Sequence, residues 1–321
     1  MKWGGLGIFI SDKKIILAAN HLRNGNIVAF PTETVYGLGA DASNNMAVKK
    51  VFKVKKRPLN NPIITHVGKS SWVSGMTEPE PRAKLLIKEF WPGPLTLILR
   101  KRSDCPISDY ATAKLETIAV RQPKNEIALR LLLELRKPIA APSANISGKV
   151  SSTNAGHVQN DFGDEIDFIL NAGECETGIE STVIDLTDDE PTILRPGAIS
   201  IEKISHIIGK TKYLFSQETN PRSPGLLPKH YSPDLPLRIN ATKKEQENEV
   251  IIGFGQNAKT NFNLSPRGDL SEAAKNLYST LRHVDDNKRF TCIAISPIPN
   301  HGIGVAINDR LRRASEGQKR D

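Results

Sequence analysis

Cysteine and aromatic residues are scarce in this sequence, and each shortage narrows the classes of protein to which the chain can belong. The 321 residues include three cysteines, Cys105, Cys175 and Cys292, which lie far apart and form no C-x-x-C motif. Isolated cysteines argue against a disulfide framework and a zinc site, so a reducing cytoplasm is the expected location. Aromatic residues account for only 6% of the chain, which leaves few side chains to stack on the bases of RNA.

Long apolar segments and two familiar nucleotide-binding motifs are missing as well. The opening stretch MKWGGLGIFI is apolar, but glycines interrupt it, and it is far too short to cross a bilayer or to read as a targeting signal. We therefore expect no membrane contact. Neither G-x-G-x-x-G nor a Walker loop occurs, so a bound nucleotide would need a different arrangement of residues.

Positive charge, by contrast, is in excess. Lysine and arginine number 44 against 35 aspartates and glutamates, which gives a formal charge of +9. This excess favours an anionic partner such as a nucleotide, a phosphate or RNA. With 38% hydrophobic and 25% charged residues the composition is that of a soluble globular protein, and the length suits two domains.

Helical and extended patterns alternate along the first two thirds of the chain, which predicts an α/β domain with a mixed sheet. The stretch KIILAANHLRNG places Ile15, Ala18, Ala19 and Leu22 on one helical face and offers Gly25 as a stop. The strands STVIDL and TILRPG are separated only by TDDEP, a connection that fits a hairpin and is too short for a parallel crossover. A helix over SIEKISHIIG is expected to close this domain near residue 209.

A second, smaller α/β domain is predicted after a proline-rich stretch, SPGLLPKHYSP, at residues 223–233. Its strands are expected over EVIIGFG and FTCIAISPI, and its helices over SEAAKNLYSTLRHVDD and GVAINDRLRRAS. The proline-rich stretch should be extended. It also contains the adjacent Lys229, His230 and Tyr231, a cation, a titratable ring and a phenol. A passive spacer needs none of these side chains, so they indicate a further role.

Three polar clusters are candidates for chemistry, and each also has a structural interpretation. PTETVYGLGAD at residues 31–41 fits a ligand-binding turn at a strand's carboxyl end or a tight β-turn. The basic KVKKRPLNNPIITH at residues 53–66 fits phosphate recognition or a solvated helix face. APSANISGKVSSTNAGHV at residues 141–158 fits an anion or sugar site, or a polar loop in which Thr153 caps the next helix. Arg121 and Arg195 follow apolar strands and together suggest a cationic cavity.

Taken in order, these motifs resemble the YrdC-like family of threonylcarbamoyl-adenylate synthases, in its long form with an added C-terminal domain. The resemblance rests on PTETVYGLGADA, KKRPLNNPIITHV, IAVRQP, APSANISG, GIESTVIDL and ILRPGAI, followed by SPGLLPKHYSP and GVAINDRLRRA. It covers nearly the whole chain, and an ordered set of this kind is far more specific than any one motif. One departure is Asn125, at a place where such proteins often have a histidine, and no role is assigned to it.

The resemblance implies a fold, a division into domains and a reaction. The expected fold is a YrdC-like mixed, twisted sheet with a large basic cavity at residues 1–215 and a small Rossmann-like α/β domain at residues 239–321. The linker at residues 216–238 is expected to act as a lid over the cavity. The family condenses L-threonine, bicarbonate or carbon dioxide, and ATP into threonylcarbamoyl-adenylate and pyrophosphate. Mg²⁺ is expected to accompany ATP with no site of its own on the protein, and no organic cofactor is expected.

The family pattern also assigns residues of this sequence to each substrate. Those expected to bind threonine are Thr34, His66, Arg121, Ala141 and Ser181. Those expected to bind ATP are Lys55, Arg57, Asn61, Thr117, Ser143, Asn145, Ser151, Arg195, His230 and Tyr231. Lys55 and Arg57 are the expected catalytic residues, because this reaction needs positioning and charge stabilisation rather than an enzyme nucleophile.

The partners follow from the same resemblance. Besides ATP, L-threonine and bicarbonate or carbon dioxide, the expected partner is a downstream tRNA-modifying transferase complex that receives the product. A weak contact of the protein with RNA is also possible. Two rival functions are an RNA-binding module and a carbamoyl-transfer enzyme related to hydrogenase maturation. The first lacks a recognisable RNA-binding motif, and the second would bring zinc-finger cysteines that this chain does not have.

Overall fold

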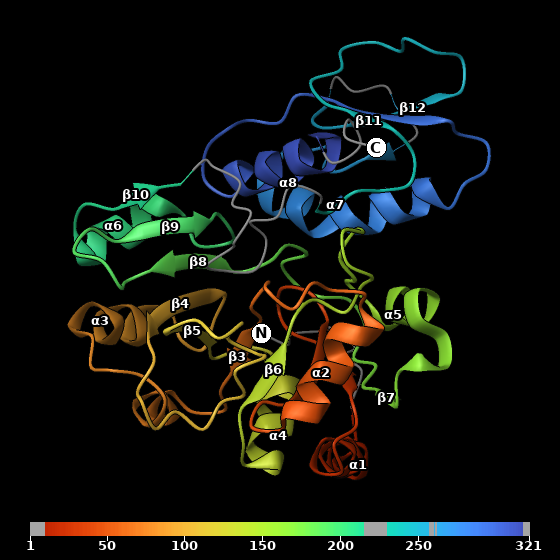
Figure 1. Cartoon of the computed structure of the whole chain (residues 1–321). Helices are drawn as coiled ribbons and strands as arrows, with labels where there is room; N and C mark the ends of the chain where they lie inside the picture. The colour runs from red at the N-terminus through yellow and green to blue at the C-terminus, as the bar shows by residue number, and fades with distance from the viewer. Residues whose placement is uncertain (1–9, 215–229, 257–259, 261, 317–321) are drawn as a thin grey trace, which may run out of the picture.

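A computed structural model describes residues 10–214, 230–256, 260 and 262–316, and within them the chain forms two sheets with helices packed against them (Figure 1). The first sheet has ten strands in the order β10-β9-β8-β4-β5-β3-β6-β2-β1-β7 and mixes parallel with antiparallel pairs. Its strands are β1 Val28–Phe30, β2 Gly37–Asp41, β3 Ile64–His66, β4 Leu95–Arg100, β5 Thr117–Arg121, β6 Ile139–Ala141, β7 Phe168–Ile169, β8 Thr182–Asp185, β9 Thr192–Arg195 and β10 Lys212–Tyr213. This mixed sheet confirms the predicted fold class.

The helices of the first domain lie close to where the apolar periodicity places them. They are α1 Asp12–Arg23, α2 Asn45–Val54, α3 Pro81–Phe90, α4 Glu126–Leu135, α5 Ala155–Phe162 and α6 Ile201–Ile208, with short 3₁₀ turns at Ser70–Gly75 and Gly163–Glu165. In α1 the buried residues are the predicted Ile15, Ala18, Ala19 and Leu22. The antiparallel pairing of β8 with β9 confirms the hairpin at TDDEP.

Three local details differ from the sequence analysis or add to it. Asn154, not Thr153, caps α5, because its side chain accepts a hydrogen bond from the His157 backbone N–H. Asn125 caps α4 by accepting from two backbone N–H groups, which gives this residue a structural role. The first sheet also continues past α6, since β10 pairs with β9.

The second sheet is fully parallel, as expected for a small Rossmann-like domain. Its order is β11-β14-β12-β13. The strands are β11 Leu237–Arg238, β12 Glu249–Gly253, β13 Phe262–Asn263 and β14 Cys292–Ile295, and the helices are α7 Leu270–Asp285 and α8 Gly304–Glu316. The proposed boundaries at residues 215/216 and 238/239 stay a prediction. Residues 216–229 of the predicted linker, Lys229 included, lie outside the described part of the chain.

The second domain shares an apolar core with the first. Helices α7 and α8 lie between the second sheet and the first domain (Figure 1). Tyr278 of α7 and Ile307 of α8 belong to the same buried cluster as Val35, Val150 and Ile179 of the first domain. Burial of this apolar surface holds the two domains together. Among the described residues, no helix has the length and apolar character needed to cross a membrane.

Candidate active site

One cavity collects most of the predicted site residues from segments that are far apart in the sequence. It holds about 510 Å³ of empty volume, part of it open to solvent. Ten of its lining residues were predicted from the sequence: Thr34, Arg57, His66, Arg121, Ala141, Ser143, Ser181, Arg195, His230 and Tyr231. His66 and Arg121 end the parallel strands β3 and β5 and are register partners, so the sheet itself places them side by side.

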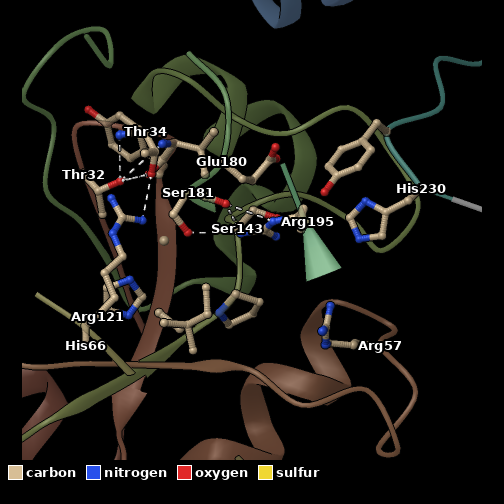
Figure 2. A pocket seen from close by; sticks show the side chains of 17 residues that line it. Thr32, Thr34, Arg57, His66, Arg121, Ser143, Glu180, Ser181, Arg195 and His230 are labelled. Atoms are coloured by element: carbon tan, nitrogen blue, oxygen red, sulfur yellow. Dashed lines mark hydrogen bonds between the residues drawn. The ribbon is translucent and has the colours of Figure 1, made fainter. Parts of the chain in front are cut away.

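Arg121 and the connection between β1 and β2 form one end of the cavity (Figure 2). The Arg121 Nη1 group donates to Thr34 Oγ1 at 3.0 Å, and its Nε group donates to the Gly93 carbonyl at 3.3 Å. Thr34 Oγ1 lies 2.8 Å from Thr32 Oγ1. These contacts fix the plane of the guanidinium, which can then face a ligand carboxylate in a defined orientation.

His66 at the same end is a neutral ring. Burial, together with the positive charge of Arg121, lowers the pKa of His66 to about 3. Its Nδ1 atom makes no hydrogen bond to any described residue. A buried ring nitrogen of this kind is available to a ligand hydroxyl or ammonium group.

Arg57 and Arg195 supply positive charge elsewhere in the cavity. Arg57 is anchored by hydrogen bonds to the carbonyls of Asn61 (3.0 Å) and Pro62 (2.8 Å). Burial lowers the pKa of Arg57 to about 9, so the guanidinium stays protonated at neutral pH. Arg195 donates to the Ser181 carbonyl at 3.1 Å and to Ser181 Oγ at 3.2 Å. Two buried guanidinium groups in one cavity suit an anionic ligand such as a phosphate chain.

Lys55 and Asn145 do not line the cavity but brace the loop that carries Ser143. The Lys55 ammonium group is buried and donates to the carbonyls of Ser143 (2.6 Å) and Asn145. Burial lowers its pKa well below the usual value. The Asn145 amide donates to two carbonyls of the same loop and accepts from Ser143 Oγ at 2.5 Å. Both residues therefore shape the wall that presents Ser143.

The other three predicted ATP-binding residues also lie outside the cavity lining. Ser151 Oγ donates to Glu180 Oε1 at 2.6 Å. Asn61 is fully buried, and its side-chain amide makes no hydrogen bond to any described residue. Thr117 begins β5, four residues before Arg121, and so lies at the far end of that strand.

His230 and Tyr231 bring the proline-rich linker into the cavity. Both are buried lining residues, and neither His230 Nδ1 nor the Tyr231 hydroxyl hydrogen-bonds a described residue. Tyr231 has a φ of 63°, a left-handed conformation that is unusual for an aromatic residue. Burial, and then Arg57, lowers the pKa of His230 well below its usual value, so the ring is neutral. Next to them, Ser232 N–H donates to the Gly148 carbonyl and joins the linker to the first domain.

The sequence analysis missed Glu180, a buried carboxylate that lines the cavity. It accepts from Tyr278 of α7 and from Arg310 of α8, each at 2.9 Å. Burial alone would raise the pKa of Glu180, but Arg310 and Arg195 hold it below the usual value. The second domain thus sets the charge of a group in the cavity. The motif GIESTVIDL contained this residue, but its partners lie about a hundred residues further along the chain.

The described residues contain no group of three or more His, Cys, Asp or Glu side chains that could hold a metal ion. The carboxylate in the cavity, Glu180, already accepts three hydrogen bonds from side chains. These donors leave Glu180 ion-paired and hydrogen-bonded within the cavity wall, so it does not fit a resident metal.

Two family models match consecutive parts of this chain. The Sua5/YciO/YrdC family model, described as "Telomere recombination", matches residues 20–197. A second model, described as the threonylcarbamoyl-AMP synthase C-terminal domain, matches residues 199–316. Curated proteins named threonylcarbamoyl-AMP synthase from Bacillus subtilis and Pyrococcus abyssi are each 42% identical to this chain. The alignments cover 96% and 95% of this chain, and 94% and 95% of the respective relatives.

Solved structures show the same similarity in three dimensions. P. abyssi Sua5 complexed with L-threonine superposes with a TM-score of 0.90 at 37% identity, covering 97% of this chain and 96% of that one. A variant of the same protein, with a histidine and the adjacent tyrosine replaced by alanine, gives 0.88 at 37% identity, covering 98% and 96%. The chain therefore belongs to the Sua5/YciO/YrdC family, in the two-domain form that carries a threonylcarbamoyl-AMP synthase C-terminal domain.

Proposed function

We propose that this protein is a nucleotidyltransferase that condenses L-threonine, bicarbonate or carbon dioxide, and ATP into L-threonylcarbamoyladenylate and pyrophosphate. The observation that carries the proposal is the cavity that brings together Arg57, Arg121 and Arg195 from three distant segments. Relatives at 42% identity are named for this product, and one relative's structure contains L-threonine.

Threonine would bind at the end of the cavity formed by Arg121 and His66. The Arg121 guanidinium would accommodate the amino-acid carboxylate, because its contacts with Thr34 and Gly93 fix its orientation. The neutral His66 ring would receive a polar group of the substrate. Ala141 and Ser181 line the same cavity, and we assign them to threonine as well.

ATP would place its phosphates near Arg57, Arg195 and Ser143. Lys55 and Asn145 would act through the loop that they brace, because their polar groups already bind its carbonyls. Ser151 would act through Glu180. Direct contacts of Asn61 and Thr117 with ATP stay predictions. Magnesium would enter as part of the substrate, bound to the phosphates of ATP.

The reaction needs no nucleophile from the protein. Threonine first loses its ammonium proton to water; the uncharged amine then attacks carbon dioxide, a C–N bond forms, and loss of a second proton to water leaves a carbamate. A carbamate oxygen then attacks the α-phosphorus of ATP, and the bond from that phosphorus to the β-phosphate oxygen breaks, so pyrophosphate leaves. The arginines would align these anions and stabilise the charge that develops on the phosphates. Lys55 would contribute indirectly through the loop.

The linker would close the cavity during the reaction. His230 and Tyr231 line the cavity with polar atoms that no described residue satisfies, so a bound nucleotide can take those hydrogen bonds. Closure would also exclude water from the mixed anhydride, which is hydrolysable. The product would pass in the cytoplasm to a tRNA-modifying transferase complex that forms threonylcarbamoyladenosine. A weak RNA contact stays a prediction.

A substrate-omission assay tests the proposed function. The protein is incubated with ATP, L-threonine and ¹⁴C-bicarbonate, and pyrophosphate and labelled nucleotide are measured together. We expect both to appear at equal rates, and both to disappear when threonine or bicarbonate is left out. Pyrophosphate release that continues without threonine, or release of ADP and phosphate in its place, would overturn the proposal.

A further inference from the structure

A second carboxylate, Glu33, lies behind Arg121 and outside the cavity lining. Glu33 Oε1 is 2.7 Å from Arg121 Nη2, and both side chains are only 4% exposed. The other oxygen, Oε2, accepts from the Lys124 backbone N–H at 3.0 Å. Arg121 lines the cavity and Glu33 does not. The carboxylate is therefore held against the guanidinium from the side away from any ligand.

The contact between Glu33 and Arg121 is a charge pair without an aligned hydrogen bond. Neither Glu33 Oε1 nor Arg121 Nη2 makes a hydrogen bond to any described residue, although the two atoms are close. The N–H groups of Nη2 therefore point elsewhere, while Nη1 and Nε are used by Thr34 and Gly93. Arg121 thus keeps donors on Nη2 that no described residue uses, but Glu33 already balances its charge.

Arg57, which lies at the other end of the cavity (Figure 2), is arranged differently. It donates to the backbone carbonyls of Asn61 and Pro62, and it forms no ion pair with any carboxylate in the described part of the chain. Of these two arginines, Arg121 has its charge balanced by a carboxylate and Arg57 does not. A multiply charged phosphate is attracted most strongly to the unbalanced charge.

We propose that Glu33 is a specificity-determining residue that directs two anionic groups to different ends of the cavity. The threonine carboxylate binds at Arg121, and the phosphates of ATP are excluded from it. This inference rests on the proposed function. Threonine is a zwitterion with no net charge, and it matches an end of the cavity whose charges cancel. ATP carries several negative charges, and it matches the end around Arg57. Glu33 acts through Arg121 and does not touch the substrate.

Competition between tripolyphosphate and threonine tests this role. Binding of L-threonine is measured by calorimetry without ATP, at increasing concentrations of tripolyphosphate. In the parent protein we expect tripolyphosphate to bind as one equivalent and to leave the threonine dissociation constant nearly unchanged. In Glu33→Gln we expect a second equivalent of tripolyphosphate to bind at the threonine site and to compete with threonine. Its affinity for that site should be about tenfold or more higher in the variant than in the parent.

Glu174→Gln is the matched control, since Glu174 is an exposed carboxylate of the loop that precedes β8. It removes the same charge without touching Arg121 and should behave like the parent. Binding stoichiometry gives a readout even if Glu33→Gln weakens threonine binding. A Glu33→Gln protein that still binds one equivalent of tripolyphosphate, without competition, overturns the inference.

The parent protein alone also tests the inference, should the variant not fold. If tripolyphosphate competes with threonine in the parent, phosphates already reach Arg121 and the sorting role is wrong. Failure of the proposed function looks different, because the parent would then not bind threonine or would release pyrophosphate without it.

Discussion

Replacing Arg310 by methionine should both loosen the second domain and disturb the cavity. Arg310 is 1% exposed, and its guanidinium lies 2.9 Å from Glu180 Oε2 and 2.9 Å from Asp309 Oδ2. It also packs over the Tyr231 ring, with 5.1 Å from Cζ to the ring centroid. Breaking a buried ion pair by removing one partner typically costs about 3–5 kcal/mol. We expect Arg310→Met to lower the melting temperature by roughly 10 °C.

The pH dependence of this loss identifies its cause. In the parent protein the pKa of Glu180 lies below its usual value. Its charge therefore stabilises the fold above the usual pKa, and this contribution is lost as the pH falls through the lower, folded value. Without Arg310 the effect of burial dominates and should raise the pKa of Glu180 above its usual value. The variant should then gain stability as the pH falls from 7.5 to 5.5, relative to the parent.

Thermal melting at these two pH values is the assay, with three further variants, one of which is Glu180→Gln alone. Arg312→Met is the matched control, because Arg312 is 41% exposed on the same helix and, among the described residues, pairs with Asp309 alone. It should change the melting temperature little. The double change Arg310→Met with Glu180→Gln should recover much of the loss, since no buried charge is then left unpaired. A loss equal at both pH values, or a double variant whose loss is the sum of the two single losses, would refute the reasoning.

Three further predictions concern the cavity. Arg121→Ala should raise the threonine concentration needed for half-maximal rate by about ten- to a hundredfold, because it removes charge-assisted hydrogen bonds to the substrate. ATP affinity should stay nearly unchanged, and equal weakening of both substrates in steady-state kinetics would contradict the assignment. Arg57→Ala should weaken ATP binding and slow turnover together, and unaltered ATP affinity by calorimetry would favour a purely structural role. His230→Ala with Tyr231→Ala should lower the yield of intact adenylate more than it lowers ATP affinity, and a time course of adenylate and pyrophosphate that matches the parent would rule out the lid.

Local structure was largely predictable from the sequence. The apolar periodicity that predicts α1 depends on residues within one helix, and the hairpin of β8 and β9 depends on a five-residue connection. Most predicted ligand-binding residues line one cavity, and several of them, such as His66, Arg121 and Arg195, stand at the ends of strands in recognisable motifs. Thr153 was chosen as a cap because threonine is suited to the role, but the neighbouring Asn154 is suited equally.

Long-range pairing could not be predicted in this way. Arg310 contacts Glu180 across 130 positions of the sequence, and Glu33 contacts Arg121 across 88 positions. Nothing in the local pattern around either carboxylate indicates a buried arginine partner. The family pattern placed Lys55 in the ATP site, yet its ammonium group donates to backbone carbonyls beside the cavity. Such choices depend on tertiary packing, which no single motif contains.

The bond between a carbamate oxygen and the α-phosphorus of ATP is the central claim, and nuclear magnetic resonance can detect the resulting C–O–P linkage directly. The protein is mixed with ¹³C-bicarbonate, L-threonine and magnesium-ATP, and ³¹P spectra are recorded within minutes. The account predicts a new adenylate phosphorus signal that is split by the ¹³C label through the bridging oxygen, together with pyrophosphate. An adenylate signal without that splitting, or ¹³C found only in bicarbonate and free carbamate while ATP is consumed, would contradict the account.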